Sequence, residues 1–238
     1  MPPDIIQVVV SVLKVIVSWS GGKDSCLSLY KALNDGLEPV CLLNIATRAG
    51  EGFRVHGLNP KIIIDQAKAL ELPIVQRTAS WESYEQVFKE AVEEIKCRLR
   101  AEGVVFGDIF LEEHRRWTIR VCEELGVKAL SPLYGEDEEE LMMEFLDAGF
   151  KAMIVCAKLD KLPEELLGRI FDREVIKILE NAGVDPCGEY GEYHTLVLDG
   201  PIFKKRIEVL EGQIEHIPRG YAVFNIRGWR LAEKRFGD

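Results

Sequence analysis

The sequence predicts an α/β fold with a Rossmann-like parallel sheet, followed by a smaller α+β region. Three observations lead to this prediction. Short runs of β-branched residues alternate with amphipathic helical patterns over the first half of the chain, which is typical of a parallel sheet covered by helices. A glycine-rich turn joins the first such run to the first helical pattern. After residue 130 the alternation stops, and several short strand-like runs follow one another.

The first region is expected to repeat a strand and a helix about five times. Asn59 before Pro60 is typical of a helix cap followed by a first-turn proline, and Gly36 and Gly126 are expected to end helices in the left-handed conformation. We expect strands over residues 12–18, 39–45, 74–78, 104–106 and 127–130. We expect the two longest helices of this region over residues 82–100 and 112–125.

The second region has a different order of elements. Helices are expected over residues 137–148 and 172–181, on either side of a strand over 152–157. Four further short strands are expected over residues 195–198, 202–210, 213–217 and 221–226. Because no long linker separates the regions, we expect two domains, 1–130 and 131–238, that pack against each other.

Composition excludes some functions. The chain has 238 residues, with 30 Lys and Arg against 40 Asp and Glu, so its net charge of −10 disfavours a general nucleic-acid binder. Its six cysteines are single, without the close pairs that a zinc site needs, which indicates buried thiols in a reducing compartment. The apolar stretch 5–17 is shorter than the roughly 20 residues that span a bilayer and lacks the features of a leader. We therefore expect a cytoplasmic protein without a membrane segment.

The strongest local signal is the run 20–25, Ser-Gly-Gly-Lys-Asp-Ser, between the first expected strand and the first helix. Its two glycines let the backbone approach an anion without a Cβ atom in the way. The N–H groups and the dipole at a helix start favour a phosphate there. Lys23 adds a mobile positive charge, and Ser20 and Ser25 add hydroxyl donors. We therefore expect a phosphate-binding loop at the carboxyl end of a parallel strand.

Two widespread phosphate loops do not fit this run. Asp24 follows Lys23 and the required upstream glycine is missing, which excludes a Walker A loop, and the run is not a GxGxxG fingerprint either. The structural alternative is a plain turn whose glycines serve geometry alone and whose charged residues face solvent. The tight cluster of donors favours the binding interpretation.

A second run, 187–195, reads Cys-Gly-Glu-Tyr-Gly-Glu-Tyr-His-Thr. It gathers two carboxylates, an imidazole and a thiol on one glycine-punctuated loop. The carboxylates could hold a cation, accept protons from an attacking amine or orient a positively charged substrate. The structural alternative is an exposed turn whose glutamates only increase solubility and whose histidine pairs locally.

These motifs resemble known families. The run 20–25 resembles the SGGxDS signature of the PP-loop family, the N-type ATP pyrophosphatases with an adenine nucleotide alpha hydrolase-like fold. Together with 107–109, Gly-Asp-Ile, and 198–203, Leu-Asp-Gly-Pro-Ile-Phe, the run 187–195 resembles the diphthine ammonia ligase family over essentially the whole chain. Tyr190 and His194 depart from the pattern of many relatives, which leaves the subfamily open.

The resemblance implies a reaction and its partners. It implies amidation of the carboxylate of diphthine, a modified histidine of translation elongation factor 2, with release of AMP and pyrophosphate through an acyl adenylate. No glutaminase domain is recognisable, so ammonia is the expected nitrogen source. Two alternatives stay open: a PP-loop ATP pyrophosphatase acting on tRNA or on a small-molecule carboxylate such as a cobalamin precursor, and a non-catalytic nucleotide sensor. The oligomeric state is also open, with a homodimer as one candidate.

The resemblance also implies ATP and Mg²⁺ as cofactors and assigns residues to them. The end of the second strand is where the geometry of a doubly wound sheet would bring the adenine. The expected ATP-binding residues are Ser18, Ser20, Gly21, Gly22, Lys23, Asp24, Ser25, Ile45, Ala46, His56 and Gly107. The expected catalytic residues are Lys23, Asp24, Asp108, Glu189 and Glu192, with Asp24 and Asp108 also expected to bind Mg²⁺.

Asp108 has a structural alternative to its expected role, whereas Glu192 has a specific expected role. Glu192 is expected to orient the ammonia, and Asp108 could instead serve only to cap the helix that follows it. The charged run 114–116, His-Arg-Arg, lies beside Asp108 near a helix start. It could be a solvated face, or one of its arginines could neutralise phosphate charge in the transition state.

Overall fold

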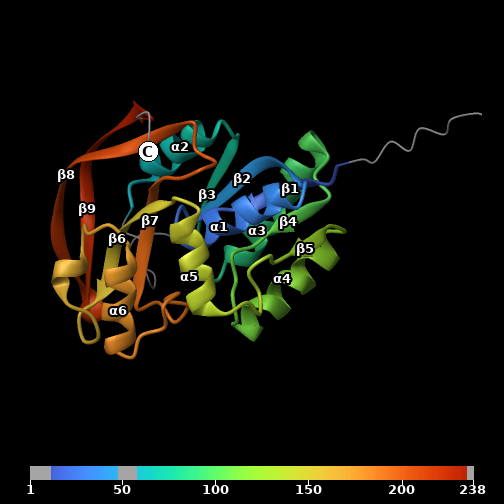
Figure 1. Cartoon of the computed structure of the whole chain (residues 1–238). Coiled ribbons are helices and arrows are strands. Elements are labelled where there is room, and N and C mark those ends of the chain that lie inside the picture. Colours follow the sequence, from blue (N-terminus) through green and yellow to red (C-terminus); the bar gives the residue numbers. More distant parts are fainter. Residues whose placement is uncertain (1–11, 48–57, 235–238) are drawn as a thin grey trace, which may run out of the picture.

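The computed structural model describes residues 12–47 and 58–234 of the chain. The first half forms a five-stranded sheet with strand order β3-β2-β1-β4-β5, and every pair of neighbouring strands is parallel (Figure 1). This confirms the predicted Rossmann-like sheet. The elements are β1 (Lys14–Ser18), α1 (Lys23–Asn34), β2 (Glu38–Thr47), α2 (Pro60–Leu70), β3 (Ile74–Ala79), α3 (Tyr84–Leu99), β4 (Gly103–Val105), α4 (Glu112–Glu124) and β5 (Lys128–Leu130).

Helices cover both faces of this sheet because its strands carry apolar side chains on both sides. Val15 and Val17 of β1 face the helices α1 and α2, whereas Ile16 faces α3 and α4. Asn59 caps α2 through its side chain, which accepts a hydrogen bond from the backbone N–H of Lys61. The expected helix cap at this position is therefore confirmed.

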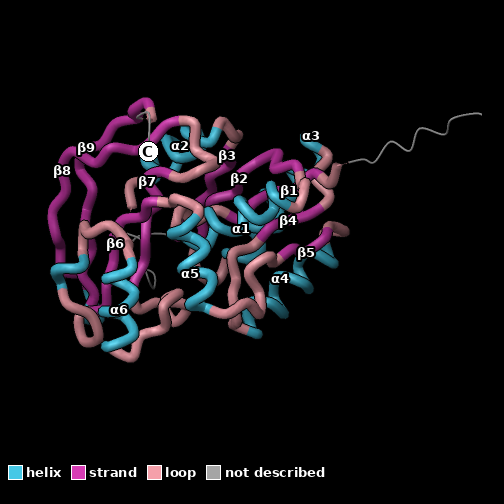
Figure 2. The backbone as a smooth tube through the Cα atoms, in the orientation of Figure 1, coloured by secondary structure: helices cyan, strands magenta, loops and turns pink. Residues whose placement is uncertain are grey.

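The second half forms a four-stranded antiparallel sheet with strand order β7-β6-β9-β8 (Figure 2). The α+β character expected for this region is confirmed, and Asp137 and Asp172 cap its two longest helices. The elements are α5 (Glu138–Asp147), β6 (Lys151–Lys158), a 3₁₀ turn (Glu164–Leu166), α6 (Arg173–Asn181), β7 (Tyr193–Asp199), β8 (Lys205–Ile217), a second 3₁₀ turn (Pro218–Gly220) and β9 (Tyr221–Glu233).

The strands at the end of the chain differ from the prediction. The two strands expected over 202–210 and 213–217 form one strand, β8, and the strand expected over 221–226 continues as β9 to Glu233. The residues taken for a turn, Glu211 and Gly212, form an irregularity in the β8–β9 register instead. A Cβ atom at Gly212 would lie 2.5 Å from the ring of Phe224, so glycine allows the close approach of this ring at the irregularity.

The two halves share one apolar core. Buried side chains of α1 and α2 belong to the same core cluster as those of α5, β6 and β7. Tyr30 of α1 meets the ring of Phe150 edge-on at 5.7 Å, and Phe150 stacks on Phe145 of α5 at 4.9 Å. This packing is expected to hold the second sheet firmly against the first.

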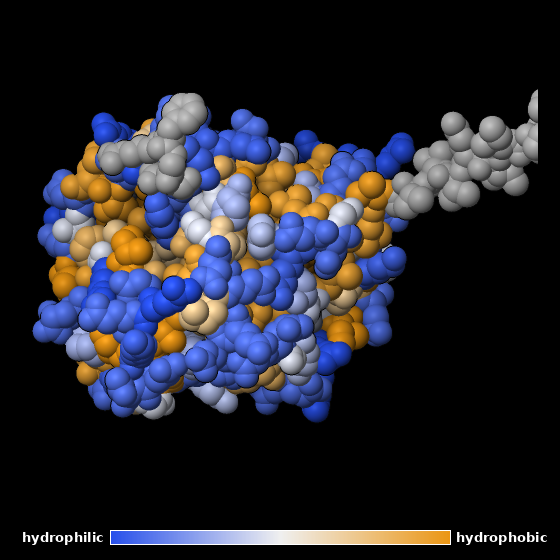
Figure 3. All heavy atoms as spheres, in the orientation of Figure 1, coloured by the Kyte–Doolittle hydropathy of each residue, from blue (hydrophilic) through white to orange (hydrophobic). Residues whose placement is uncertain are grey.

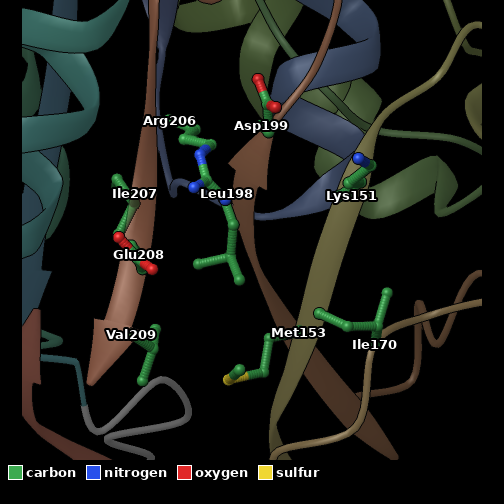
Figure 4. Close-up of a pocket in the computed structure, with 9 residues that line it drawn as sticks. All are labelled: Lys151, Met153, Ile170, Leu198, Asp199, Arg206, Ile207, Glu208 and Val209. Atoms are coloured by element: carbon green, nitrogen blue, oxygen red, sulfur yellow. The ribbon is translucent and has the colours of Figure 1, made fainter. Parts of the chain in front are cut away.

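The surface and the smaller cavity give little sign of function. On the face drawn in Figure 3, hydrophobic residues form separate patches among hydrophilic ones. Among the described helices, none has the length and apolar character needed to cross a membrane. A pocket of about 230 Å³ lies between β8 and the strands β6 and β7 (Figure 4), and none of the predicted site residues lines it.

Candidate functional site

A cleft of about 1550 Å³ lies at the carboxyl edge of the parallel sheet. Five of the predicted site residues line it: Ser18, Ser20, Ile45, Ala46 and Asp108. Ser18 ends β1, and Asp108 follows β4, so neighbouring strands contribute to one site as an open α/β sheet requires. His56 lies outside the described residues.

The loop between β1 and α1 is compact because its own serines hold it. The hydroxyl of Ser20 accepts a hydrogen bond from the backbone N–H of Gly22 at 3.2 Å. The hydroxyl of Ser25 donates to the carbonyl of Gly22 at 3.0 Å. Gly21 has a φ of +82°, a conformation that favours glycine. A Cβ atom at Gly107 would lie 3.0 Å from the backbone of Asp24, so this glycine lets the loop after β4 approach closely.

The second sheet also holds this loop. Thr195 of β7 accepts a hydrogen bond from the backbone N–H of Lys23 at 3.0 Å through its hydroxyl. The backbone N–H of Val197 donates to the carbonyl of Gly21 at 2.9 Å. The edge strand of the second sheet thus pairs with the phosphate loop instead of facing solvent at these positions. Two N–H groups that the sequence leaves free for a phosphate, those of Gly22 and Lys23, are therefore already bonded.

Gln66 of α2 connects the loop, β7 and Trp19. It is fully buried, and its side-chain N–H₂ donates to the carbonyls of Gly21 at 2.9 Å and Val197 at 2.7 Å. Its side-chain oxygen accepts a hydrogen bond from the indole of Trp19 at 3.2 Å. One side chain thus bonds to three buried polar groups from two distant segments, the loop after β1 and β7. Nothing in the sequence marks this residue as special beyond its place among the helical positions of α2.

Lys23 is not mobile, contrary to the expectation from sequence. Only 3% of its side chain is exposed, and its ammonium lies 3.0 Å from Asp24 and 5.0 Å from the ring centroid of Tyr193. It also donates a hydrogen bond to the carbonyl of Cys187. Burial lowers the pKa of Lys23, but the attractions of Asp24, Tyr193 and Cys187 together outweigh burial and leave the pKa above its ordinary value. The ammonium of Lys23 therefore stays charged. It is also held in one position, because the second domain encloses the side chain.

Three carboxylates form an acidic cluster in front of this charge. Asp24 Oδ1 and Asp108 Oδ2 are buried and have no hydrogen-bond partner among the described residues. Glu189 Oε2 accepts a hydrogen bond from the backbone N–H of Ile109 at 3.4 Å, which brings the run 187–195 beside Asp108. Burial and the neighbouring Asp24 and Asp108 raise the pKa of Glu189, and burial raises that of Asp24. This electrostatic cost favours a cation or a proton among them.

Glu192 faces a different part of the molecule. Its carboxylate pairs with Lys161 at 3.1 Å, and its carbonyl accepts a hydrogen bond from the backbone N–H of Lys158. The chain turns between the two glutamates at Gly191, which has a φ of +81°. The structure therefore brings Glu189, and not Glu192, into contact with the loop after β4.

The charged run at the start of α4 divides into three environments. His114 Nδ1 lies 3.5 Å from Asp108 Oδ1, lines the cleft, and has a pKa raised chiefly by this contact. Arg115 lies over the ring of Tyr134 at 4.2 Å, and Arg116 forms an exposed ion pair with Glu112. Of the three residues, only His114 lines the cleft, whereas the sequence prediction emphasised the arginines.

Aromatic residues make up a further wall of the cleft. Tyr84, Phe88 and Trp117 pack against one another, with ring centroids 5.2–5.9 Å apart in the Phe88–Trp117 and Tyr84–Trp117 pairs. Trp81 lines the same cleft and is largely exposed. Trp117 packs in this wall, and its indole also donates a hydrogen bond to Glu85 at 2.9 Å.

Comparison with known families agrees with this architecture. A family model described as the diphthamide synthase N-terminal domain matches residues 13–129, and one described as the C-terminal domain matches residues 137–227. The chain belongs to the diphthamide synthase family. The first match covers the unit that carries the phosphate loop, and the second covers the unit that carries Glu189 and β7.

The curated relatives are named diphthine–ammonia ligase. The diphthine–ammonia ligase of Schizosaccharomyces pombe is 30% identical over 226 residues, which cover 86% of this chain and 37% of that protein. The human diphthine–ammonia ligase is 28% identical over 226 residues, 85% of each chain. The chain thus spans just over a third of the fission yeast relative and most of the human one. Among solved structures, a predicted subunit of tRNA methyltransferase from Methanocaldococcus jannaschii is 17% identical, with a TM-score of 0.44 over 80% of this chain and 98% of that one.

Replacement of Gln66 by leucine is predicted to destabilise the protein. The change preserves bulk but removes the hydrogen bonds to the carbonyls of Gly21 and Val197 and the one from the indole N–H of Trp19. The carbonyl of Gly21 keeps its bond from Val197, and a buried polar group left without a partner costs about 1–3 kcal/mol. Gln86 on α3, whose side chain bonds only to Glu90 on an exposed face, provides a matched control. Chemical denaturation should show a lower free energy of unfolding for Gln66→Leu, and a change within about 0.5 kcal/mol for Gln86→Leu. Equal effects would contradict the role assigned to Gln66.

Glu138 is predicted to make stability depend on pH. Burial, with a smaller contribution from the neighbouring Asp185, raises its pKa from 4.5 to about 7 in the folded protein. The folded state therefore binds more protons than the unfolded state over this range, so the contribution of Glu138 to the free energy of unfolding falls as pH rises from 4.5 to 7. Between pH 4.5 and 7, denaturation should show a smaller loss of the free energy of unfolding for Glu138→Gln than for the unaltered protein. Parallel curves would refute the assignment.

Proposed function

We propose that this protein is an ATP-dependent amide ligase that converts diphthine on elongation factor 2 to diphthamide. Ammonia supplies the nitrogen, and AMP and pyrophosphate are released. In this proposal the domain formed by residues 1–130 binds ATP and the domain formed by 131–238 supplies the substrate-side loop. Because elongation factor 2 acts in the cytoplasm, the reaction belongs to that compartment.

The observation that carries the proposal is the meeting of two motifs at one sheet edge. The hydrogen bond between Glu189 and the backbone of Ile109 joins the second motif to the loop after β4, while Thr195 and Val197 join it to the phosphate loop. The cleft beside them is larger than the roughly 300–1,000 Å³ of ordinary ligand pockets. This size supports binding of a nucleotide together with part of a second substrate.

The chemistry requires an activated carboxylate. A carboxylate is a poor acyl donor at neutral pH, so its oxygen first attacks the α-phosphorus of ATP, which gives an acyl adenylate and releases pyrophosphate. Ammonia then attacks the acyl carbon and AMP leaves. The fixed charge of Lys23 behind the loop would stabilise negative charge on the phosphates, while Ser18 and Ser20 contact them from the cleft.

Asp108, which lines the cleft, and Asp24 of the adjoining loop offer a donor set that fits Mg²⁺. Asp24 Oδ1 and Asp108 Oδ2 are buried oxygens without hydrogen-bond partners, and Mg²⁺ uses one or two carboxylates together with phosphate oxygens and water. Among the described residues no group of three or more His, Cys, Asp or Glu side chains could hold a metal ion, which agrees with a metal that depends on the nucleotide for its other ligands. When bound, Mg²⁺ would neutralise phosphate charge.

Glu189 is the proposed acceptor of the proton that the nitrogen loses. Ammonium must lose a proton before it can attack, and attack on the acyl carbon releases another. The raised pKa of Glu189 brings this carboxylate closer to the working range of a general base. Glu192, held by Lys161, would orient the loop rather than touch the nitrogen.

The proposal predicts a specific product pattern. The protein, ATP, ammonium and elongation factor 2 bearing diphthine should together yield AMP and pyrophosphate in equal amounts. Without the factor neither product should form, and without ammonium no AMP should be released. Glu189→Gln should retain ATP binding but lower the rate of amidation roughly 100-fold or more, as loss of a general base does. Glu192→Gln is the matched control and should reduce the rate less.

Other products would contradict the proposal. Formation of ADP would exclude an adenylate, and AMP formation with tRNA or a cobalamin precursor in place of the factor would support the alternative substrates. An equal loss of ATP affinity and amidation in Glu189→Gln would move this residue to the nucleotide side.

A further inference from the structure

Trp81 stands out among the side chains that line the cleft. It is 78% exposed, whereas the other large hydrophobic residues of the cleft in the described ranges are buried or partly buried. Tyr84, Phe88 and Trp117 all contact other rings. A single exposed hydrophobic residue needs no explanation by itself. This one, however, is an indole on the wall of the cleft at the carboxyl edge of the parallel sheet.

The turn that carries Trp81 is held rigidly. The hydroxyl of Ser83 accepts a hydrogen bond from the backbone N–H of Ser80 at 2.9 Å, and the hydroxyl of Ser80 accepts one from the backbone N–H of Ser83 at 3.2 Å. The carbonyl of Trp81 accepts a further hydrogen bond from Tyr84 at the start of α3. These reciprocal bonds resemble a capping box and fix the backbone on both sides of the indole. The exposed ring is therefore presented from a defined position.

The register of the sheet gives that position. Ala46 of β2 pairs with Thr78 of β3, and the next pair is Thr47 with Ala79. Trp81 follows two residues after Ala79, so it lies past the carboxyl end of β3, and it lines the same cleft as Ile45 and Ala46. The phosphate loop follows β1, two strands away. Two strand spacings are roughly 10 Å, comparable with the span from the phosphates of a nucleotide across its ribose to the base.

We propose that Trp81 binds the adenine ring of ATP by stacking. This inference rests on the proposed function, because it requires that the triphosphate lie at the loop after β1. The indole offers a flat apolar face, and the backbone at Ile45 and Ala46 lies on the same side of the cleft to contact the edges of the base. Stacking of a base on an aromatic side chain is worth enough to change affinity about 5- to 100-fold.

The competing occupant is a cationic group of the protein substrate. Indole faces attract cations, and Glu82 adjoins Trp81 in the turn. The position beside β2 favours the base, because Glu189, which serves the substrate side in the proposed function, contacts the loop after β4 on the far side of β1. Affinities for ATP and for the substrate protein separate the two occupants.

The test measures binding of ATP and of inorganic pyrophosphate by calorimetry with the full chain. Trp81→Ala should raise the Kd for ATP about 5- to 100-fold and leave the Kd for pyrophosphate unchanged, because pyrophosphate has no base. Trp81→Phe should restore most of the ATP affinity. Leu210→Ala, which removes an exposed apolar side chain from β8 away from the cleft, should change neither constant. Thermal denaturation would verify that all variants fold.

Three outcomes would overturn the inference. An unchanged Kd for ATP with a raised KM for elongation factor 2 would assign Trp81 to the substrate. An equal weakening of ATP and pyrophosphate would mean that the turn supports the loop and does not contact the base. If the unaltered protein bound no ATP, the proposed function would fail together with this inference, whereas the first two outcomes leave the proposed function standing.

Discussion

The hydrogen bonds between β7 and the phosphate loop are the interactions on which the rest of the site depends. The loop leaves β1 in a left-handed turn at Gly21, and its next residues receive support from Thr195 and Val197, more than 170 positions along the chain. The segment of the second domain that makes this contact also encloses Lys23 and carries Glu189. In the proposed function the second domain is therefore part of the nucleotide site and not only a platform for a second substrate.

Charge organises what this contact encloses. A buried ammonium, that of Lys23, lies behind the loop, and the carboxylates of Asp24, Asp108 and Glu189 lie in front of it. Burial raises the pKa of Asp24 even though Lys23 lies 3.0 Å away, and burial together with the neighbouring Asp24 and Asp108 raises the pKa of Glu189. A metal ion or a proton delivered with the substrates would offset this repulsion. Bound ligands of this kind would therefore lower the electrostatic repulsion among the three carboxylates.

The sequence predicted the elements that depend on local patterns. The parallel strands follow from short β-branched runs, the cap of α2 follows from Asn59 and Pro60, and the turn between β1 and α1 follows from its two glycines. It did not predict Gln66 or Thr195, because their roles arise from contacts between distant segments. Local patterns also could not predict that Glu189 and Glu192 lie in different environments, since Gly191 turns the chain between them. No sequence pattern indicated a role for Trp81.

The most direct test of this account is the affinity of Thr195→Val for ATP. Valine keeps the shape of threonine on β7 but cannot accept the hydrogen bond from the backbone N–H of Lys23. A buried donor without a partner costs about 1–3 kcal/mol. Calorimetry should show an ATP affinity lowered by about tenfold while circular dichroism shows an intact fold. An unchanged affinity would contradict the claim that the second sheet sets the geometry of the phosphate loop.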